Sequence, residues 1–157
     1  MDPFASEKSD DKESGGVSLT WVHPQYLDDI WIDAGYYLNR AAKKSRGRYT
    51  VFDIRRDIES GDQHLWVLFR GDNEMILAMT TSFVFYPNRK NLCVAFIGSN
   101  DDSNWTKYTK MIVEQLEDFA REAHCDGIEL SGRMGWLKVL SPYGWERAFV
   151  VLEKEIE

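Results

Sequence analysis

The sequence is poor in cysteine and has no long apolar run. Its two cysteines, Cys93 and Cys125, belong to no Cys-x-x-Cys or Cys/His pattern, which argues against a zinc site. We expect both thiols to be reduced core side chains of a cytosolic protein, with a disulfide between them as the alternative. No apolar run approaches the roughly 20 residues that cross a bilayer, and the acidic, polar N-terminus is unlike a secretory signal. The sequence therefore predicts no membrane association.

Positive charge is also scarce. The chain has 26 acidic and 19 basic side chains and a formal net charge of −7. Nucleic acids and anionic membranes bind to basic surfaces, so this balance disfavours both as partners. The one dense basic run lies within residues 40–48 and has two interpretations, a solvated helix end and an anion site. Its members are Arg40, Lys43, Lys44, Arg46 and Arg48.

Hydrophobic side chains are present in ordinary amount, and aromatic ones are abundant. The chain has 157 residues, of which 43% are hydrophobic and 13% aromatic, enough for one domain with a ring-rich core. Residues 1–16 are acidic and polar and carry no apolar pattern. Such a segment buries too little surface to offset its ordering entropy, so we expect a disordered acidic tail. The domain then spans residues 17–157.

The periodicity of apolar residues predicts an α+β domain with a mixed sheet. Helices are expected from Pro24 to Lys44, from Thr50 to Gly61 with Asp53 completing a capping box, and at 105–124. Strands are expected at 17–22, 64–70, 74–86, 91–98, 127–132 and 148–156, with a hairpin loop at 71–73 and a short helix before the last strand. The strands that flank the long helix should be parallel, by the right-handed crossover rule.

This order of elements resembles the GNAT acyltransferase fold. The likeness is carried by GRYTVFDIRRDIESGDQHLWVLF and by EQLEDFAREAHCDGIELSGRMGWLKVLSPYGWERAFVVLEKEI, and it covers roughly residues 20–157. In detail the segments resemble short GNAT-like proteins encoded by tailed bacteriophages. The resemblance implies a mostly antiparallel central sheet flanked by helices and splayed between the fourth and fifth strands. GNAT enzymes bind acetyl-CoA in that opening.

The resemblance also implies where a cofactor would bind. GNAT enzymes hold the pyrophosphate on an Arg/Gln-x-x-Gly-x-Gly/Ala motif before the long helix, and residues 98–104 are the equivalent segment. It has one glycine and two adjacent acids, Asp101 and Asp102, which repel phosphate or cap the helix themselves. The candidate acetyl-CoA-binding residues of this segment are Gly98, Ser99, Asn100, Ser103 and Asn104. Arg133 is a further candidate for a CoA phosphate, or for pairing with an acid of the chain or of a partner.

A second GNAT motif tests for a catalytic acid. Many members have a tyrosine that protonates the CoA thiolate, four residues before the glycine of a Gly-Phe pair. Aligning Gly144-Trp145 with that pair places Leu140 at the tyrosine position, and a leucine has no proton to give. The neighbouring Tyr143 is the candidate acid, and Glu129, in a predicted strand, is the candidate base. The tryptophans of this region, such as Trp136, are expected to pack a corner of the core.

Two functions follow from this resemblance. One is a phage-encoded, catalytically degenerate GNAT-like protein that acts by binding, as an internal or structural virion protein or on a host protein. It would be found in the phage virion or in the host cytoplasm. The alternative is an active acetyl-CoA-dependent N-acetyltransferase with a non-standard site. The sequence leaves the oligomeric state open.

Overall fold

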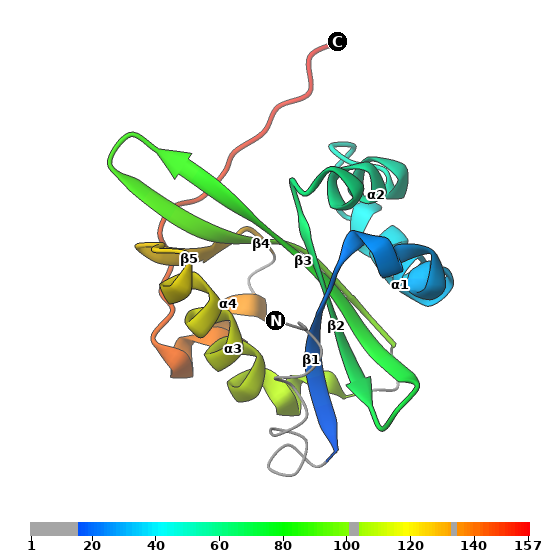
Figure 1. Cartoon of the computed structure of the whole chain (residues 1–157). Helices are drawn as coiled ribbons and strands as arrows, with labels where there is room; N and C mark the ends of the chain where they lie inside the picture. The colour runs from blue at the N-terminus through cyan, green and yellow to red at the C-terminus, as the bar shows by residue number, and fades with distance from the viewer. Residues whose placement is uncertain (1–15, 101–103, 133–134) are drawn as a thin grey trace.

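A five-stranded mixed sheet forms the centre of the molecule. The computed structural model describes residues 16–100, 104–132 and 135–157. The strands lie in chain order, and Figure 1 shows them as one twisted layer. They are β1 (Val17–Val22), β2 (His64–Arg70), β3 (Glu74–Tyr86), β4 (Arg89–Ser99) and β5 (Gly127–Leu130). Strands β1 to β4 pair antiparallel, and β5 joins β4 in parallel, so the predicted fold class and the parallel pair are confirmed.

Helices cover both faces of this sheet (Figure 1). One face carries α1 (Leu27–Ala42) and α2 (Val51–Ser60), and the other carries α3 (Thr109–Glu122). Short 3-10 turns, η1 (Pro24–Tyr26) and η2 (Trp105–Tyr108), precede α1 and α3, and α4 (Gly135–Leu140) and η3 (Ser141–Tyr143) follow β5. The predicted long helix thus begins as a 3-10 turn.

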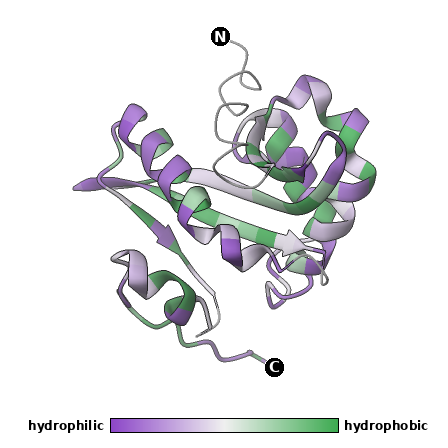
Figure 2. Ribbon diagram, turned by 90° about the horizontal axis from the view of Figure 1, so that it is seen from below, coloured by the Kyte–Doolittle hydropathy of each residue, from purple (hydrophilic) through white to green (hydrophobic). Residues whose placement is uncertain are grey.

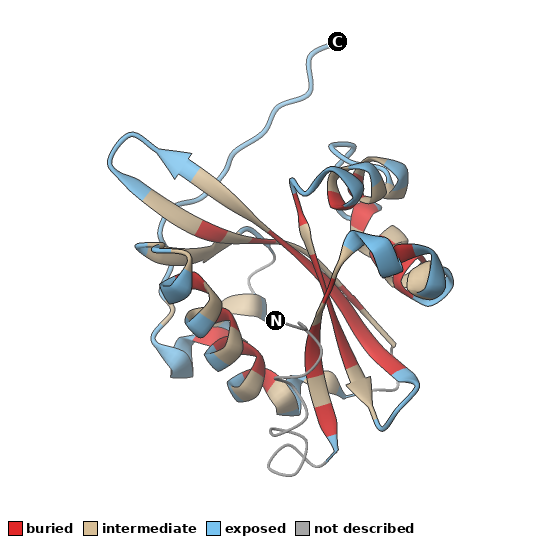
Figure 3. Cartoon of the chain, in the orientation of Figure 1, coloured by how far each residue is buried: buried red, intermediate tan, exposed pale blue. Residues whose placement is uncertain are grey.

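Each face has its own apolar cluster, because alternate side chains of a strand point to opposite faces. On the α1 and α2 side, Leu38 and Ile54 pack with Val67. On the α3 side, Leu116 packs with Leu68, which follows Val67 in β2. The most buried positions therefore lie along the middle of the sheet, as Figure 3 shows.

Local sequence signals explain the ends of α2. The Thr50 side chain accepts a hydrogen bond from the Asp53 backbone N–H, and the Asp53 carboxylate accepts one from the Thr50 N–H at 2.8 Å. These bonds hold the pKa of Asp53 below its usual value. The helix stops at Gly61, whose φ of 87° suits a residue without Cβ. The predicted capping box and helix end are confirmed.

The fourth and fifth strands separate after a short paired stretch. β5 pairs only with Asn91–Val94 of β4, whereas β4 continues to Ser99. The far end of β4 instead approaches α1. A Cβ on Gly98 would lie 2.0 Å from the Tyr37 carbonyl oxygen, and Arg40 donates a hydrogen bond to the Ser99 carbonyl. This divergence is the splay expected between the fourth and fifth strands.

The prediction of a strand at 148–156 is wrong. Residues 145–157 have no helix or strand assignment, and the segment runs away from β5 toward the C-terminus. Its pattern suits an extended strand, and Figure 2 shows apolar positions along it. A strand also requires a partner backbone, however, and within the described residues the outer edge of β5 joins no other strand.

Candidate functional site

A hollow of about 1300 Å³ follows the open edge of β5. One wall is formed by β5 with the end of the β3–β4 hairpin, residues 86–91. Another is formed by α4 and η3, and a third by residues 145–151 of the C-terminal segment. The hollow therefore begins at the hairpin tip and reaches the point where β5 ends.

The carboxylate of Glu129 lies on the β5 wall of the hollow. The two β5 neighbours of Glu129 pack into the α3-side core, so its own side chain emerges on the opposite face. There Glu129 Oε1 accepts hydrogen bonds from the Tyr86 hydroxyl at 2.6 Å and from Asn91 Nδ2 at 3.0 Å. Arg89 Nε in turn donates to Asn91 Oδ1 at 3.0 Å, which fixes the orientation of the amide. The Glu129 carboxylate raises the pKa of Tyr86, so the phenol stays a donor.

Cys93 lies opposite Glu129 in the β4–β5 register but is not a nucleophile. Burial raises the pKa of its thiol to about 11, and the Glu129 charge adds to the effect. The reactive thiolate is therefore scarce at neutral pH. Burial also raises the pKa of Cys125. Both cysteines are free, so the expected reduced thiols are found and the alternative disulfide is not.

The structure brings the two predicted catalytic residues to the same hollow. Glu129 lies on the β5 wall, and Tyr143 lies on the η3 wall with 40% of its surface exposed. Leu140, at the position that the resemblance assigns to a catalytic tyrosine, is buried with 8% exposed. Its side chain packs and offers no proton. Tyr86 and Asn91 were not foreseen, because only the hairpin fold brings them to β5.

The tryptophans near the hollow pack against each other. The rings of Trp105, at the start of η2, and Trp136, in α4, have centroids 5.5 Å apart. A Cβ on Gly132 would lie 2.6 Å from Trp136 Cδ1, so the missing side chain leaves room for the indole. Trp136 thus packs on Trp105 beside the core, but it is half-buried and also lines the hollow, so the expected core packing is found only in part.

The predicted cofactor segment is described only in part. Gly98 is buried against α1, and the Asn100 N–H donates to the Ile76 carbonyl at 3.1 Å, continuing the β3–β4 pairing. Asn104 adopts the left-handed conformation just before η2. Four residues named from the sequence lie outside the described residues, namely Asp101, Asp102, Ser103 and Arg133.

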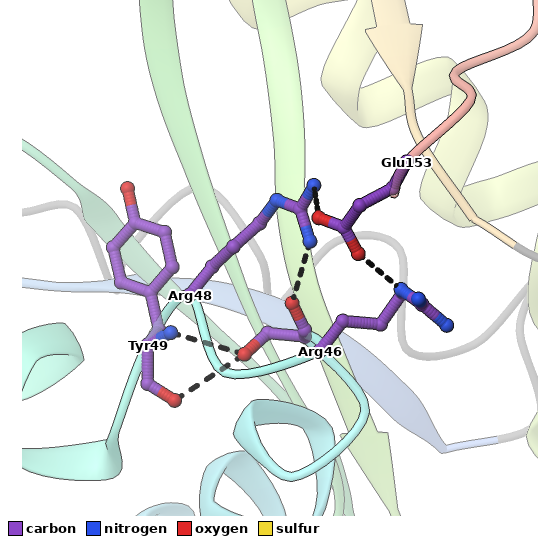
Figure 4. Close-up of polar contacts among 5 residues, drawn as sticks. Arg46, Arg48, Tyr49 and Glu153 are labelled. Carbon is purple, nitrogen blue, oxygen red and sulfur yellow. Dashed lines mark hydrogen bonds and ion pairs between the residues drawn. The ribbon is translucent and has the colours of Figure 1, made fainter. Parts of the chain in front are cut away.

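The basic run at the end of α1 holds a carboxylate of the same chain. Arg46 and Arg48 each donate to one oxygen of Glu153 from the C-terminal segment (Figure 4). The loop that carries them is shaped by Ser45 Oγ, which accepts from the Tyr49 N–H at 3.0 Å. The two arginines lower the pKa of Glu153. Their side chains are 66% and 48% exposed, so solvent screens the contact and it holds the segment weakly.

Among the described residues, no group of three or more His, Cys, Asp or Glu side chains is arranged to hold a metal ion. No helix in the described part of the chain is long and apolar enough to span a bilayer.

Comparison with known proteins gives a match in structure alone. No family model matches the chain, and no curated protein matches it. Among solved structures, a probable acetyltransferase has a TM-score of 0.67 at 10% identity, covering 88% of this chain and 97% of its own. An aminoglycoside acetyltransferase from an uncultured soil metagenomic sample, in complex with trehalose, has a TM-score of 0.64 at 11% identity. The match covers 91% of this chain and 98% of that chain.

A third structure is a predicted acetyltransferase with acetyl-CoA from Clostridium acetobutylicum. Its TM-score is 0.61 at 14% identity, with 88% of this chain and 96% of that chain covered. At such low identity the likeness establishes the fold and not the chemistry. It extends over nearly the whole length of each of the three structures. The chain has a GNAT acetyltransferase-like fold.

Proposed function

We propose that this chain is an acetyl-CoA-dependent N-acetyltransferase with a non-standard site, in which Glu129 is the general base. The observation that carries the proposal is the setting of that carboxylate. It is held by two neutral donors, faces a hollow, and lies one residue before the point where β4 and β5 separate. The acetyltransferase fold supports the proposal but does not establish the reaction.

The open edge of β4 suits an extended cofactor. Beyond Val94, residues 95–97 carry no β5 strand on that side, and a strand edge presents N–H and C=O groups to a chain with amides of its own. We therefore assign the pantetheine arm to this edge. Gly98 offers no phosphate cradle, because α1 fills the space over its Cα. When bound, acetyl-CoA supplies an activated acyl group as a thioester.

Glu129 is suited to moving a proton. The Tyr86 and Asn91 donors both reach Oε1, and within the described residues no hydrogen bond is found on Oε2. Oε2 can thus accept a proton from the ammonium group of an acceptor, which leaves the amine lone pair free to attack. The Tyr86 hydroxyl and the Asn91 amide hold the carboxylate in place. Tyr143, across the hollow, is the proton donor available for a leaving thiolate.

Acetyl transfer to a simple primary amine tests this assignment. Removing a general base typically lowers the rate by about 10²–10⁴-fold, and we expect Glu129→Gln to lose at least the lower figure. Glu117→Gln is the matched control, because Glu117 lines the same hollow from α3. Equal rates for the two variants would remove Glu129 from the mechanism.

A second candidate function rests on a different observation. Leu140 is buried, and the rings of Trp105 and Trp136 pack against each other. These side chains contribute to packing and not to proton transfer. This favours a catalytically degenerate protein, and we propose that such a protein would act by binding a virion or host protein. It predicts the same fold with no acetyl-CoA binding, so cofactor binding separates the two functions.

A further inference from the structure

Arg46 and Arg48, the arginine pair, together hold one carboxylate. Arg46 Nε donates to Glu153 Oε1 and Arg48 Nη2 donates to Glu153 Oε2, so each oxygen has its own guanidinium donor (Figure 4). Hydrogen bonds between guanidinium groups and a carboxylate are stronger than neutral ones, and they fix the orientation of the bound group. The arginine pair therefore has the chemistry of a carboxylate site.

Contacts within the loop between α1 and α2 hold the arginine pair in shape. Ser45 Oγ accepts from the Tyr49 N–H at 3.0 Å, and the Ser45 carbonyl accepts from Arg48 Nη1 at 3.3 Å. Arg46 and Gly47 both have positive φ, of 58° and 79°, and this conformation is uncommon for a residue with a Cβ. The loop is thus preorganised, which lowers the entropic cost of binding a ligand.

The same loop packs against the open edge of β4. The ring of Tyr49, the residue after Arg48, contacts the ring of Phe96 with centroids 5.0 Å apart. Phe96 belongs to the stretch 95–97, which carries no β5 strand. Because we assign the pantetheine arm to this stretch, the arginine pair lies beside the proposed cofactor edge.

The C-terminal segment connects the arginine pair to the hollow. Val151 and Glu129 both line the hollow, and Glu153 follows Val151 by two residues. Two residues of extended chain span at most about 7 Å, so the carboxylate on the arginine pair belongs to a residue just outside the hollow. The arginine pair is therefore close to the hollow that contains the proposed general base.

We propose that Arg46 and Arg48 bind a carboxylate group of the acceptor amine, and that Glu153 occupies this site in the absence of acceptor. The identity of the ligand as an acceptor rests on the proposed acetyl transfer, whereas the carboxylate site does not. The arginine side chains are 66% and 48% exposed, so their contact with Glu153 is weak and an acceptor can displace it. The site selects amines that carry a carboxylate over plain alkyl amines.

Binding of glutarate, a dicarboxylate without an amine, tests the carboxylate site with no turnover. In NMR titrations of the full-length chain, Glu153→Gln should bind glutarate about two- to fivefold more tightly than the natural chain, the range for removing an exposed ion pair. Glu155→Gln removes the same charge from an exposed position two residues later and should bind like the natural chain. Adding Arg46→Gln and Arg48→Gln to the Glu153→Gln chain should weaken binding at least about tenfold.

Acetyl transfer to ω-amino acids of increasing length, from glycine to aminohexanoate, tests the acceptor. Each is compared with the alkyl amine of the same length that lacks the carboxylate. At one or more lengths, kcat/KM should be at least about tenfold higher for the amino acid. Arg46→Gln with Arg48→Gln should lose this preference and leave kcat/KM for the alkyl amine and KM for acetyl-CoA unchanged. The control is Lys43→Gln with Lys44→Gln, which removes two exposed charges from the same basic run and should keep the preference.

Three results would overturn the proposal. The first is a Glu153→Gln chain that binds glutarate no better than the Glu155→Gln chain. The second is the absence of a preference for the carboxylate at every length, or a preference that survives the double arginine variant. The third is a double arginine variant that raises KM for acetyl-CoA instead, which would assign the pair to a CoA phosphate.

Failure of the proposed function gives a different pattern. A chain that acetylates no amine, but binds glutarate at the arginine pair, would overturn acetyl transfer and the acceptor assignment and would support the carboxylate site.

Discussion

Trp105 and Trp136 contact each other with ring centroids 5.5 Å apart and planes inclined by 39°. The first opens η2, which follows β4, and the second lies in α4, which follows β5. The pair therefore joins the two segments that leave the separating strands. Offset aromatic pairs of this kind add to the stability that comes from burial.

A double-mutant cycle should measure this contact. We expect Trp105→Ala and Trp136→Ala to show a coupling free energy of about 0.5–1.5 kcal/mol in urea unfolding, the range for an aromatic pair. The same cycle between Trp105 and Trp31, which lies on α1 across the sheet, is the control. Its coupling should stay within about 0.3–0.5 kcal/mol of zero. Equal coupling in both cycles would mean that the tryptophan contact contributes nothing specific.

Phe119 is predicted to be a major core contact of α3. Its ring lies 5.1–5.9 Å from the rings of four others, namely Trp21, His64, Trp66 and Phe83. We expect Phe119→Ala to lower the free energy of unfolding by about 3–5 kcal/mol. Lys110→Ala, on the exposed side of the same helix, should change it by less than about 0.5 kcal/mol. A loss below about 1 kcal/mol for Phe119→Ala, in urea unfolding, would show that the ring cluster is loosely packed.

Two glycines should respond oppositely to alanine. Gly98→Ala places a methyl group 2.0 Å from the Tyr37 carbonyl oxygen, so we expect a cost of about 1–3 kcal/mol from displacing α1. Gly135, in α4, has open space around its Cα, and Gly135→Ala should stabilise by about 0.5–1 kcal/mol. Thermal unfolding of the two variants measures whether their stability changes in these opposite directions. A neutral Gly98→Ala would contradict the close approach of α1 to β4.

Stability should fall as pH drops below the ordinary pKa of histidine. Burial lowers the pKa of His64 from 6.5, and its Nδ1 shares a hydrogen bond with Thr81 Oγ1. Since the folded pKa lies below the unfolded one, the unfolded chain binds the proton first. The contribution of neutral His64 to stability is complete above about pH 6.5 and is lost as the pH falls toward the folded pKa. Urea unfolding across this pH window should show that the free energy of unfolding of the natural chain falls with pH, and that it falls less steeply for His64→Gln. Equal pH dependence in the two chains would contradict this prediction.

Much of the fold could be predicted because its signals are local. The Thr50–Asp53 box, the loop at 71–73 and the apolar stripe of the long helix all depend on residues close in sequence. The segment at 148–156 has an equally good local pattern but forms no strand. Pairing is decided by whether another backbone lies alongside, and a pattern of side chains does not report that.

The candidate site could be predicted only residue by residue. Glu129 and Tyr143 were identified from resemblance and residue type, and the fold brings both to one hollow. The donors to Glu129 were missed, because Tyr86 is separated from it by the hairpin and by α3. Gly98 matched a phosphate motif by its identity alone, whereas its neighbour in space is the backbone of α1.

Calorimetric titration of acetyl-CoA into the full-length chain tests the proposed function most directly, since it requires no knowledge of the acceptor. An acetyltransferase should bind one acetyl-CoA per chain with a dissociation constant between about 1 μM and 1 mM, the range in which enzymes usually bind substrates. The account predicts saturable binding within that range, at the weaker end because Gly98 supplies no phosphate cradle. No saturable heat up to about 1 mM acetyl-CoA would contradict the account and would favour the degenerate binding protein.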